Sequence, residues 1–123
     1  MMALYESAEM YLETIYRLSE KLGAVRSIDI AENMGYSKPS VSRAVSLLKK
    51  GGYLTMAKDG SLTLTEDGKK TAQKIFERHN VLSQFLAFIG VDSEIATKDA
   101  CRIEHIVSDE TIKAIKNFLE KQA

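Results

Sequence analysis

The fold can be predicted outward from residues 37–50, which read SKPSVSRAVSLLKK. Ser37 is suited to cap a helix, and Pro39 fits its first turn, where no intrahelical hydrogen bond is lost. Gly51-Gly52 ends the helix. The apolar residues between them recur at helical spacing and predict one buried stripe: Val41, Ala44, Val45 and Leu48.

Two further helices are predicted before this one. A short helix runs from Ser27, its expected N-cap, to Met34, and Gly35 suits a left-handed stop. The tight turn at Gly35-Tyr36 then joins two helices as in a helix-turn-helix. A longer helix from about Glu6 to Leu22 comes first, with an apolar face that starts at Leu4.

The hydrophobic period changes to two after Gly52. Residues 53–56 and 61–64 flank Lys58-Asp59-Gly60, and Asp-Gly predicts a hairpin with a two-residue turn, placed as a wing. Three helices follow, with expected caps at Thr65, Ser93 and Ser108, and the middle one is expected to reach about Val107. The predicted fold is mainly α: a winged helix-turn-helix domain over residues 1–73, then a helical domain over residues 74–123.

Composition restricts the functions that fit. The 123 residues are 45% hydrophobic and have zero net charge, but residues 35–74 hold eight Lys and Arg against three Asp and Glu. This local excess of positive charge is what phosphate binding needs, although a solvated basic face would look the same. No apolar run is long enough to span a membrane, and the acidic N-terminus does not resemble a signal peptide. One cysteine excludes an intrachain disulfide, so we expect a cytoplasmic protein.

The residues left outside the buried stripe of the 37–50 helix are small, hydroxylated or basic, as a helix in the major groove requires. Arg43 can pair with a guanine, Pro39 can touch a thymine methyl, and the serines can bond phosphates or bases. Lysines at the helix end and in the hairpin suit the DNA backbone. The predicted DNA contacts are Ser37, Lys38, Pro39, Ser40, Ser42, Arg43, Lys49, Lys50 and Lys58.

The run ACRIEH at residues 100–105 suggests a metal site. Cys101, Glu104 and His105 stand at i, i+3 and i+4, so on a helix their side chains converge. All three are ligands of first-row transition metals, and Met10, Glu13 or His79 can supply a further donor. Alternatively, Met10 and Cys101 serve only to fill the core, and His105 lies on the surface.

Three segments resemble the diphtheria-toxin-repressor family of metal-dependent transcriptional regulators: EMYLETIYRLSE (9–20), KPSVSRAVSLLKKGGYL (38–54) and DACRIEHIVSDE (99–110). The resemblance implies a homodimer that binds an operator with metal as corepressor and represses metal-uptake genes. It assigns DNA binding to residues 1–73, and dimerisation and metal binding to residues 74–123. It also implies the short form, without the SH3-like domain of the iron-sensing branch.

The resemblance further implies a primary metal site of Met10, Cys101, Glu104 and His105, with Cys101 binding through its sulfur, its backbone carbonyl or both. A second site would use Glu13 and His79 together with Glu104. The iron branch's other ligands for that site fall at Ser83 and Thr97, which are poor substitutes.

Metal preference can be predicted from ligand softness. A thioether at Met10 and a thiol at Cys101 favour Fe²⁺, with Mn²⁺ second, and Co²⁺, Ni²⁺ or Zn²⁺ are expected to substitute in vitro.

We therefore predict a cytoplasmic, metal-dependent repressor that binds an inverted-repeat operator as a homodimer and associates with no membrane. The alternative is a winged-helix regulator that responds to an organic ligand or to oxidation of Cys101 without metal. An enzyme is not expected, because no general base beside an open coordination position is apparent.

Overall fold

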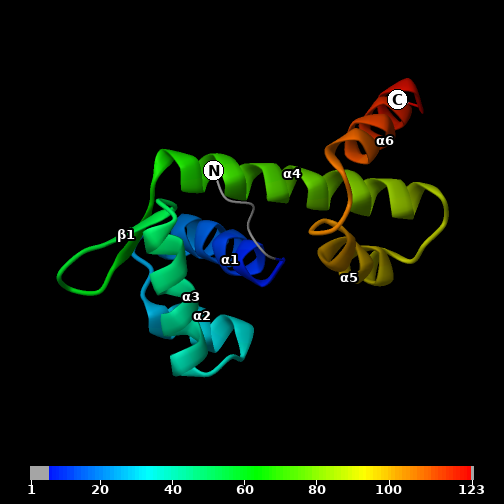
Figure 1. Cartoon of the computed structure of the whole chain (residues 1–123). Helices are drawn as coiled ribbons and strands as arrows, with labels where there is room; N and C mark the ends of the chain where they lie inside the picture. The colour runs from blue at the N-terminus through cyan, green and yellow to red at the C-terminus, as the bar shows by residue number, and fades with distance from the viewer. Residues whose placement is uncertain (1–5, 123) are drawn as a thin grey trace. The chain divides into compact units, whose positions relative to one another are not determined.

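The computed structural model describes residues 6–122, so Leu4 lies outside the described part. The mainly helical, winged helix-turn-helix fold is confirmed (Figure 1). Its elements in order are α1 (Glu6–Leu22), α2 (Ser27–Met34), α3 (Lys38–Lys50), β1 (Leu54–Met56), β2 (Leu62–Leu64), α4 (Glu66–Phe88), α5 (Ser93–Ile103) and α6 (Asp109–Gln122). Backbone contacts divide the chain into two units, Met1–Gln73 and Lys74–Ala123.

The first unit is built around a core shared by α1, α2 and α3. Its fully buried large side chains include Leu12, Ile15, Ile30, Val41 and Leu48. Burying each such side chain contributes about 1.5–3 kcal/mol, which fixes α3 against the two preceding helices. The outer face of α3 is thereby left to solvent.

The caps of the helix-turn-helix differ from the prediction at one helix. Ser37 caps α3 as expected, since its hydroxyl accepts from Ser40 N, and Gly35 ends α2 in the left-handed region at φ 71°. Ser27 was wrongly predicted as the cap of α2, because it is the first helical residue. The cap is Arg26, whose backbone N–H donates to the Asp29 carboxylate at 2.9 Å.

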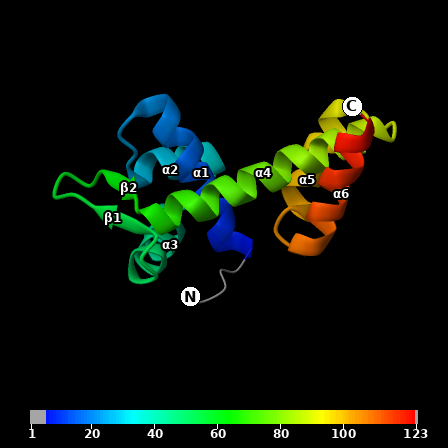
Figure 2. The ribbon, with the colours of Figure 1, turned by 90° about the horizontal axis from the view of Figure 1, so that it is seen from above.

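The wing is an antiparallel pair of strands with Thr55 opposite Thr63. Its turn is not the predicted two-residue Asp-Gly turn. Gly60 N donates to Ala57 O, Ala57 N donates to Ser61 O, and Gly60 has a φ of 88°, so the loop has three residues. Leu62 N also donates to Val25 O, which ties the wing to the segment before α2 (Figure 2).

The wing meets the start of α4 through a close backbone contact. Thr65 caps α4 as predicted, with its hydroxyl accepting from Gly68 N. Gly68 is buried, and a Cβ on it would lie 2.2 Å from Tyr53 O. Glycine is therefore required here for space.

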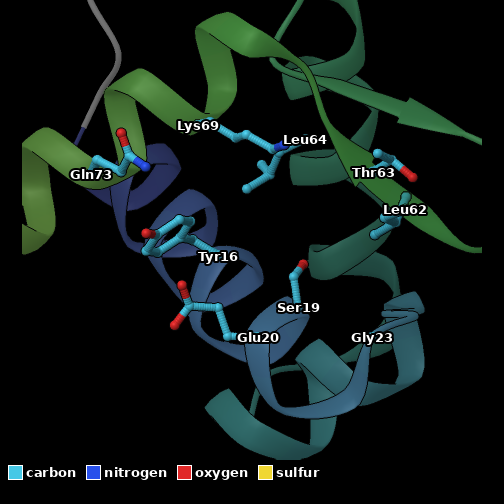
Figure 3. A pocket seen from close by; sticks show the side chains of 9 residues that line it. All are labelled: Tyr16, Ser19, Glu20, Gly23, Leu62, Thr63, Leu64, Lys69 and Gln73. Atoms are coloured by element: carbon cyan, nitrogen blue, oxygen red, sulfur yellow. The ribbon is translucent and has the colours of Figure 1, made fainter.

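A hollow of about 350 Å³ lies between α1, β2 and the first turns of α4 (Figure 3). Tyr16 and Glu20 line it from α1, and Lys69 and Gln73 line it from α4. None of the predicted metal ligands or DNA contacts is among its lining residues.

The second unit consists of the later turns of α4 together with α5 and α6. Leu82, Ala100 and Ile112 form its small core, one from each helix. The Phe118 ring packs edge-on against both Phe85 and Phe88, with ring centroids 5.9 and 5.7 Å apart. Ser108 caps α6 as predicted, through Thr111 N.

Helix α5 departs from the prediction at both ends. Asp92, not Ser93, is its N-cap and accepts from Glu94 N at 3.2 Å. The helix ends at Ile103 rather than near Val107, and a turn connects it to α6. Within residues 6–122, no helix is long and apolar enough to cross a membrane.

Candidate metal centre and nucleic-acid interface

The outer face of α3 is polar and basic, as predicted. Eight of the nine predicted DNA contacts are exposed, and Ser40 is half-buried, with its backbone N–H and its hydroxyl both bonded to the Ser37 hydroxyl. The Ser37 and Ser40 hydroxyls are 2.9 Å apart and fix the first turn of α3. Arg43 and Lys50 project from this face two turns apart and present positive charge to solvent.

The wing tip presents one cation outward. The Ser61 hydroxyl and backbone N–H bond the Asp59 carboxylate, and together with Arg26 they hold its pKa below the usual range. That carboxylate is bonded to Ser61 but remains exposed, and Lys58 beside it is exposed as well. The hydrogen bonds of Asp59 to Ser61 and its ion pair with Arg26 offset part of its negative charge beside Lys58.

The predicted metal ligands of the second unit do not all lie on one helix. Cys101 is on α5, Glu104 is its C-cap residue, and His105 belongs to the turn that follows. The assumption of a continuous helical face through His105 was therefore wrong. The turn instead brings the Glu104 and His105 side chains together.

Glu104 is the centre of this group. Its side chain is fully buried, with Oε2 2.9 Å from Nδ1 of His79 and Oε1 3.3 Å from Nε2 of His105. Cys101 Sγ lies 3.7 Å from the same Nδ1 of His79. The resemblance implies that His79 shares a second site with Glu13 and Glu104, whereas its contact with Cys101 could not be inferred from spacing, because His79 lies on α4.

These spacings suit ligands of a common ion. Two N or O ligands about 2.1 Å from a metal and at right angles to each other are about 3.0 Å apart. The Glu104–His79 and Glu104–His105 contacts are close to that value. Nevertheless, across residues 6–122 no three His, Cys, Asp or Glu side chains are already gathered for metal binding. The described residues therefore show pairs of donors rather than a completed set of ligands.

Arg78 holds the turn that carries these ligands. Its Nη1 donates to Glu104 O at 3.0 Å and Val107 O at 2.6 Å, while Nη2 pairs with Asp109. These hydrogen bonds, with one from Lys74, keep the pKa of Asp109 below its usual range. No sequence motif indicated Arg78, because two of its partners are backbone carbonyls 26 and 29 residues away.

The remaining predicted ligands belong to the first unit. Met10 is half-buried on α1, and its carbonyl accepts from the Thr14 hydroxyl at 2.9 Å. Glu13, one turn later, is 6% exposed, with Oε1 3.8 Å from Arg17 Nη2. The carboxylate of Glu13 and the thioether of Met10 are thus two possible donors of different softness, one helical turn apart on α1.

Comparison with sequence families assigns both units. Residues 3–62 match the family described as "Iron dependent repressor, N-terminal DNA binding domain", and residues 65–123 match "Iron dependent repressor, metal binding and dimerisation domain". The chain belongs to this family of metal-dependent transcriptional repressors. The repressor therefore has a DNA-binding domain followed by a domain for metal binding and dimerisation, and a divalent metal ion is its effector.

Individual relatives agree with this assignment. The repressor is 37% identical over 116 residues to the transcriptional regulator MntR of Escherichia coli O6:H1, covering 94% of this chain and 75% of that protein. It is 40% identical over 114 residues to the HTH-type transcriptional regulator MntR of Bacillus subtilis strain 168, covering 93% and 80%. The structure of the manganese regulator SloR superimposes with a TM-score of 0.81 at 29% identity, covering 97% of this chain and 55% of SloR. The chain thus spans about half of SloR.

Proposed function

We propose that this chain acts in the cytoplasm as a homodimeric repressor that binds an inverted-repeat operator when a divalent ion occupies a site of Met10, Cys101, Glu104 and His105. The observation that carries the proposal is the buried Glu104 carboxylate between two imidazoles. A buried carboxylate is costly unless positive charge or hydrogen bonds compensate it. A divalent ion would supply that charge.

The contacts of His79 support adding it to the same site. Its Nδ1 lies 2.9 Å from Glu104 Oε2 and 3.7 Å from Cys101 Sγ, two of the proposed ligands. Glu13 and His79 as a separate second site remain a prediction. In the proposal, Glu104 holds the ion at the centre, the imidazoles orient the carboxylate, and Cys101 sets the softness of the site.

We favour Fe²⁺, with Mn²⁺ second, because the thioether of Met10 and the thiol of Cys101 are softer than carboxylate ligands. Support for Mn²⁺ comes from the relatives, since SloR is described as a manganese regulator. If Cys101 binds through its backbone carbonyl, a hard oxygen ligand replaces the soft sulfur, and the affinity for Mn²⁺ rises relative to that for Fe²⁺. The competition between the two ions is therefore decided mainly by the coordinating atom of Cys101.

The second unit has the apolar surface that a homodimer requires. Phe88, Ile95 and Phe118 are 55%, 53% and 40% exposed, which is much apolar area for a unit with so small a core. A second copy related by a twofold axis would bury this apolar surface, and the dimer would then present two α3 helices, one from each copy. An operator with inverted half-sites follows from that symmetry.

Metal is expected to favour one of two arrangements of the repressor rather than to create a new one. In the first unit, α1 carries Met10 and Glu13 and also contacts the helix-turn-helix. Buried Tyr11 packs on Tyr36, in the turn before α3, with ring centroids 5.8 Å apart. Any constraint on α1 can therefore reach the DNA-reading helix through packed side chains.

The test is fluorescence anisotropy of a labelled operator, selected from a random-sequence duplex library in the presence of metal. Wild type should bind with anaerobic Fe²⁺ or with Mn²⁺ and lose binding in excess chelator. Glu104→Gln should bind little metal and no operator, whereas Lys116→Ala, which removes an exposed ion pair with Glu77, should behave as wild type. Operator binding that is unaffected by chelator would refute the proposal.

A further inference from the structure

One apolar side chain lies in the middle of the basic surface of α3. Leu47 is 67% exposed, the highest value of any large hydrophobic side chain among the described residues of the first unit. It follows Arg43 by one helical turn, so the two side chains share the outward face of α3. Leu47 is not part of the core, to which α3 contributes Val41, Val45 and Leu48.

Leu47 also borders a shallow hollow of about 370 Å³ that is open to solvent. The other lining residues are Ser42, Arg43, Ser46 and Lys50, all on the same helix. Two cations and two hydroxyls thus surround one exposed leucine. This combination favours DNA as the occupant, because DNA offers phosphates to the two cations and, in the major groove, thymine methyl groups to the leucine.

We propose that Leu47 is a specificity determinant that contacts the methyl group of a thymine in the major groove. Four residues of helix rise by about 6 Å, close to two base-pair steps of about 3.4 Å. A methyl about two base pairs beyond the base read by Arg43 is therefore within reach of Leu47 when α3 lies in the groove. This inference rests on the proposed function, since it assumes that α3 enters the major groove of an operator.

The test uses deoxyuridine, which removes only the thymine methyl. Metal-loaded wild type first selects a duplex from a random-sequence library, and each thymine of one half-site is then replaced by deoxyuridine in turn. At one position, wild type should lose about fourfold in affinity, the value of one buried methyl. Leu47→Ala should bind the unmodified duplex roughly tenfold more weakly and be insensitive to deoxyuridine at that position.

Leu22→Ala is the matched control, because it truncates another exposed leucine of the first unit that lies on α1 and does not line this hollow, and it should keep the deoxyuridine effect. Loss of the effect only in Leu47→Ala supports the inference. Unchanged operator affinity of Leu47→Ala, or persistence of the same effect in it, overturns the inference while leaving the proposed function intact. If Leu47→Ala changes the oligomeric state measured by sedimentation but keeps the deoxyuridine effect, the inference is also overturned, and Leu47 is assigned to a contact between two copies of the chain. Failure of metal-loaded wild type to select any duplex refutes the proposed function and this inference together.

Discussion

The guanidinium of Arg78 donates to the backbone carbonyl of Glu104 at 3.0 Å. The same side chain holds Val107 and Asp109, so one residue of α4 fixes both ends of the turn between α5 and α6. That turn contains Glu104 and His105. The position of the candidate metal ligands in the second unit therefore depends on a residue that binds no metal itself.

Replacing Arg78 should weaken both the fold and metal binding. Arg78→Ala leaves two backbone carbonyls without this donor and should lower the free energy of unfolding by about 2–3 kcal/mol. Loss of support for the ligands should weaken metal binding by about 10- to 100-fold. Urea denaturation and Mn²⁺ titration calorimetry measure the two effects. Lys116→Ala is the control, and equal metal affinity in both variants would show that Arg78 does not position the ligands.

The DNA contacts should separate into two kinds. Arg43→Ala should cost about 1–3 kcal/mol of operator binding and relax specificity at one base pair of each half-site. Lys49→Ala should instead weaken all duplexes alike and reduce the salt dependence of binding. Anisotropy titrations against single-base variants at several salt concentrations distinguish the two. Operator binding of Arg43→Ala that equals wild type at matched salt would exclude this helix as the reader.

Metal choice should follow the hardness of two ligands. Combining Met10→Asp with Cys101→Glu replaces two soft donors by carboxylates and should shift the Mn²⁺ to Fe²⁺ affinity ratio toward Mn²⁺ by about tenfold or more. Anaerobic competition titrations measure the ratio. In wild type, Co²⁺ should give a thiolate charge-transfer band if the Cys101 sulfur coordinates. An unchanged ratio would mean that these two side chains do not set selectivity.

Gly68 should not tolerate the usual helix-stabilising substitution. Alanine inside a helix is normally favoured over glycine by about 1 kcal/mol. Here its Cβ would meet Tyr53 O at 2.2 Å, so Gly68→Ala should lower the free energy of unfolding by about 1–3 kcal/mol. Chemical denaturation tests this, with exposed Gln73→Ala as the control on the same helix. A stabilised Gly68→Ala would mean that the wing moves away from α4 at no cost.

The stability of the chain should depend on Asp109 in acid. Hydrogen bonds from Arg78 and Lys74 lower the pKa of Asp109, so the folded state favours its ionised form. This contribution is complete above the unfolded pKa of about 3.9 and is lost as pH falls through the lower folded value. The stability difference between wild type and Asp109→Asn should therefore shrink as pH is lowered below about 4. A difference that stays constant from pH 6 to pH 2.5 would contradict this assignment.

The first unit could largely be predicted from the sequence because its signals are local. Ser37 caps α3 through a residue three positions away, Gly35 adopts a left-handed conformation that other residues rarely reach, and Thr65 caps α4. Each depends on a few consecutive residues. The outward face of α3 could be predicted in the same way, because the helical spacing of the apolar residues identifies the buried stripe and leaves the other residues exposed.

The candidate metal centre needed the tertiary structure. The run at residues 100–105 named Cys101, Glu104 and His105, but the end of α5 at Ile103 changed how they meet. His79 lies 25 residues from Glu104 in the chain and only 2.9 Å from it in space, and the Arg78 contacts are as distant in sequence. Capping and periodicity act over one or two helical turns, whereas these contacts arise when α4 packs against α5 and α6. The sequence by itself determined which side chains can bind DNA and metal, and packing between distant helices decided which of them stand together.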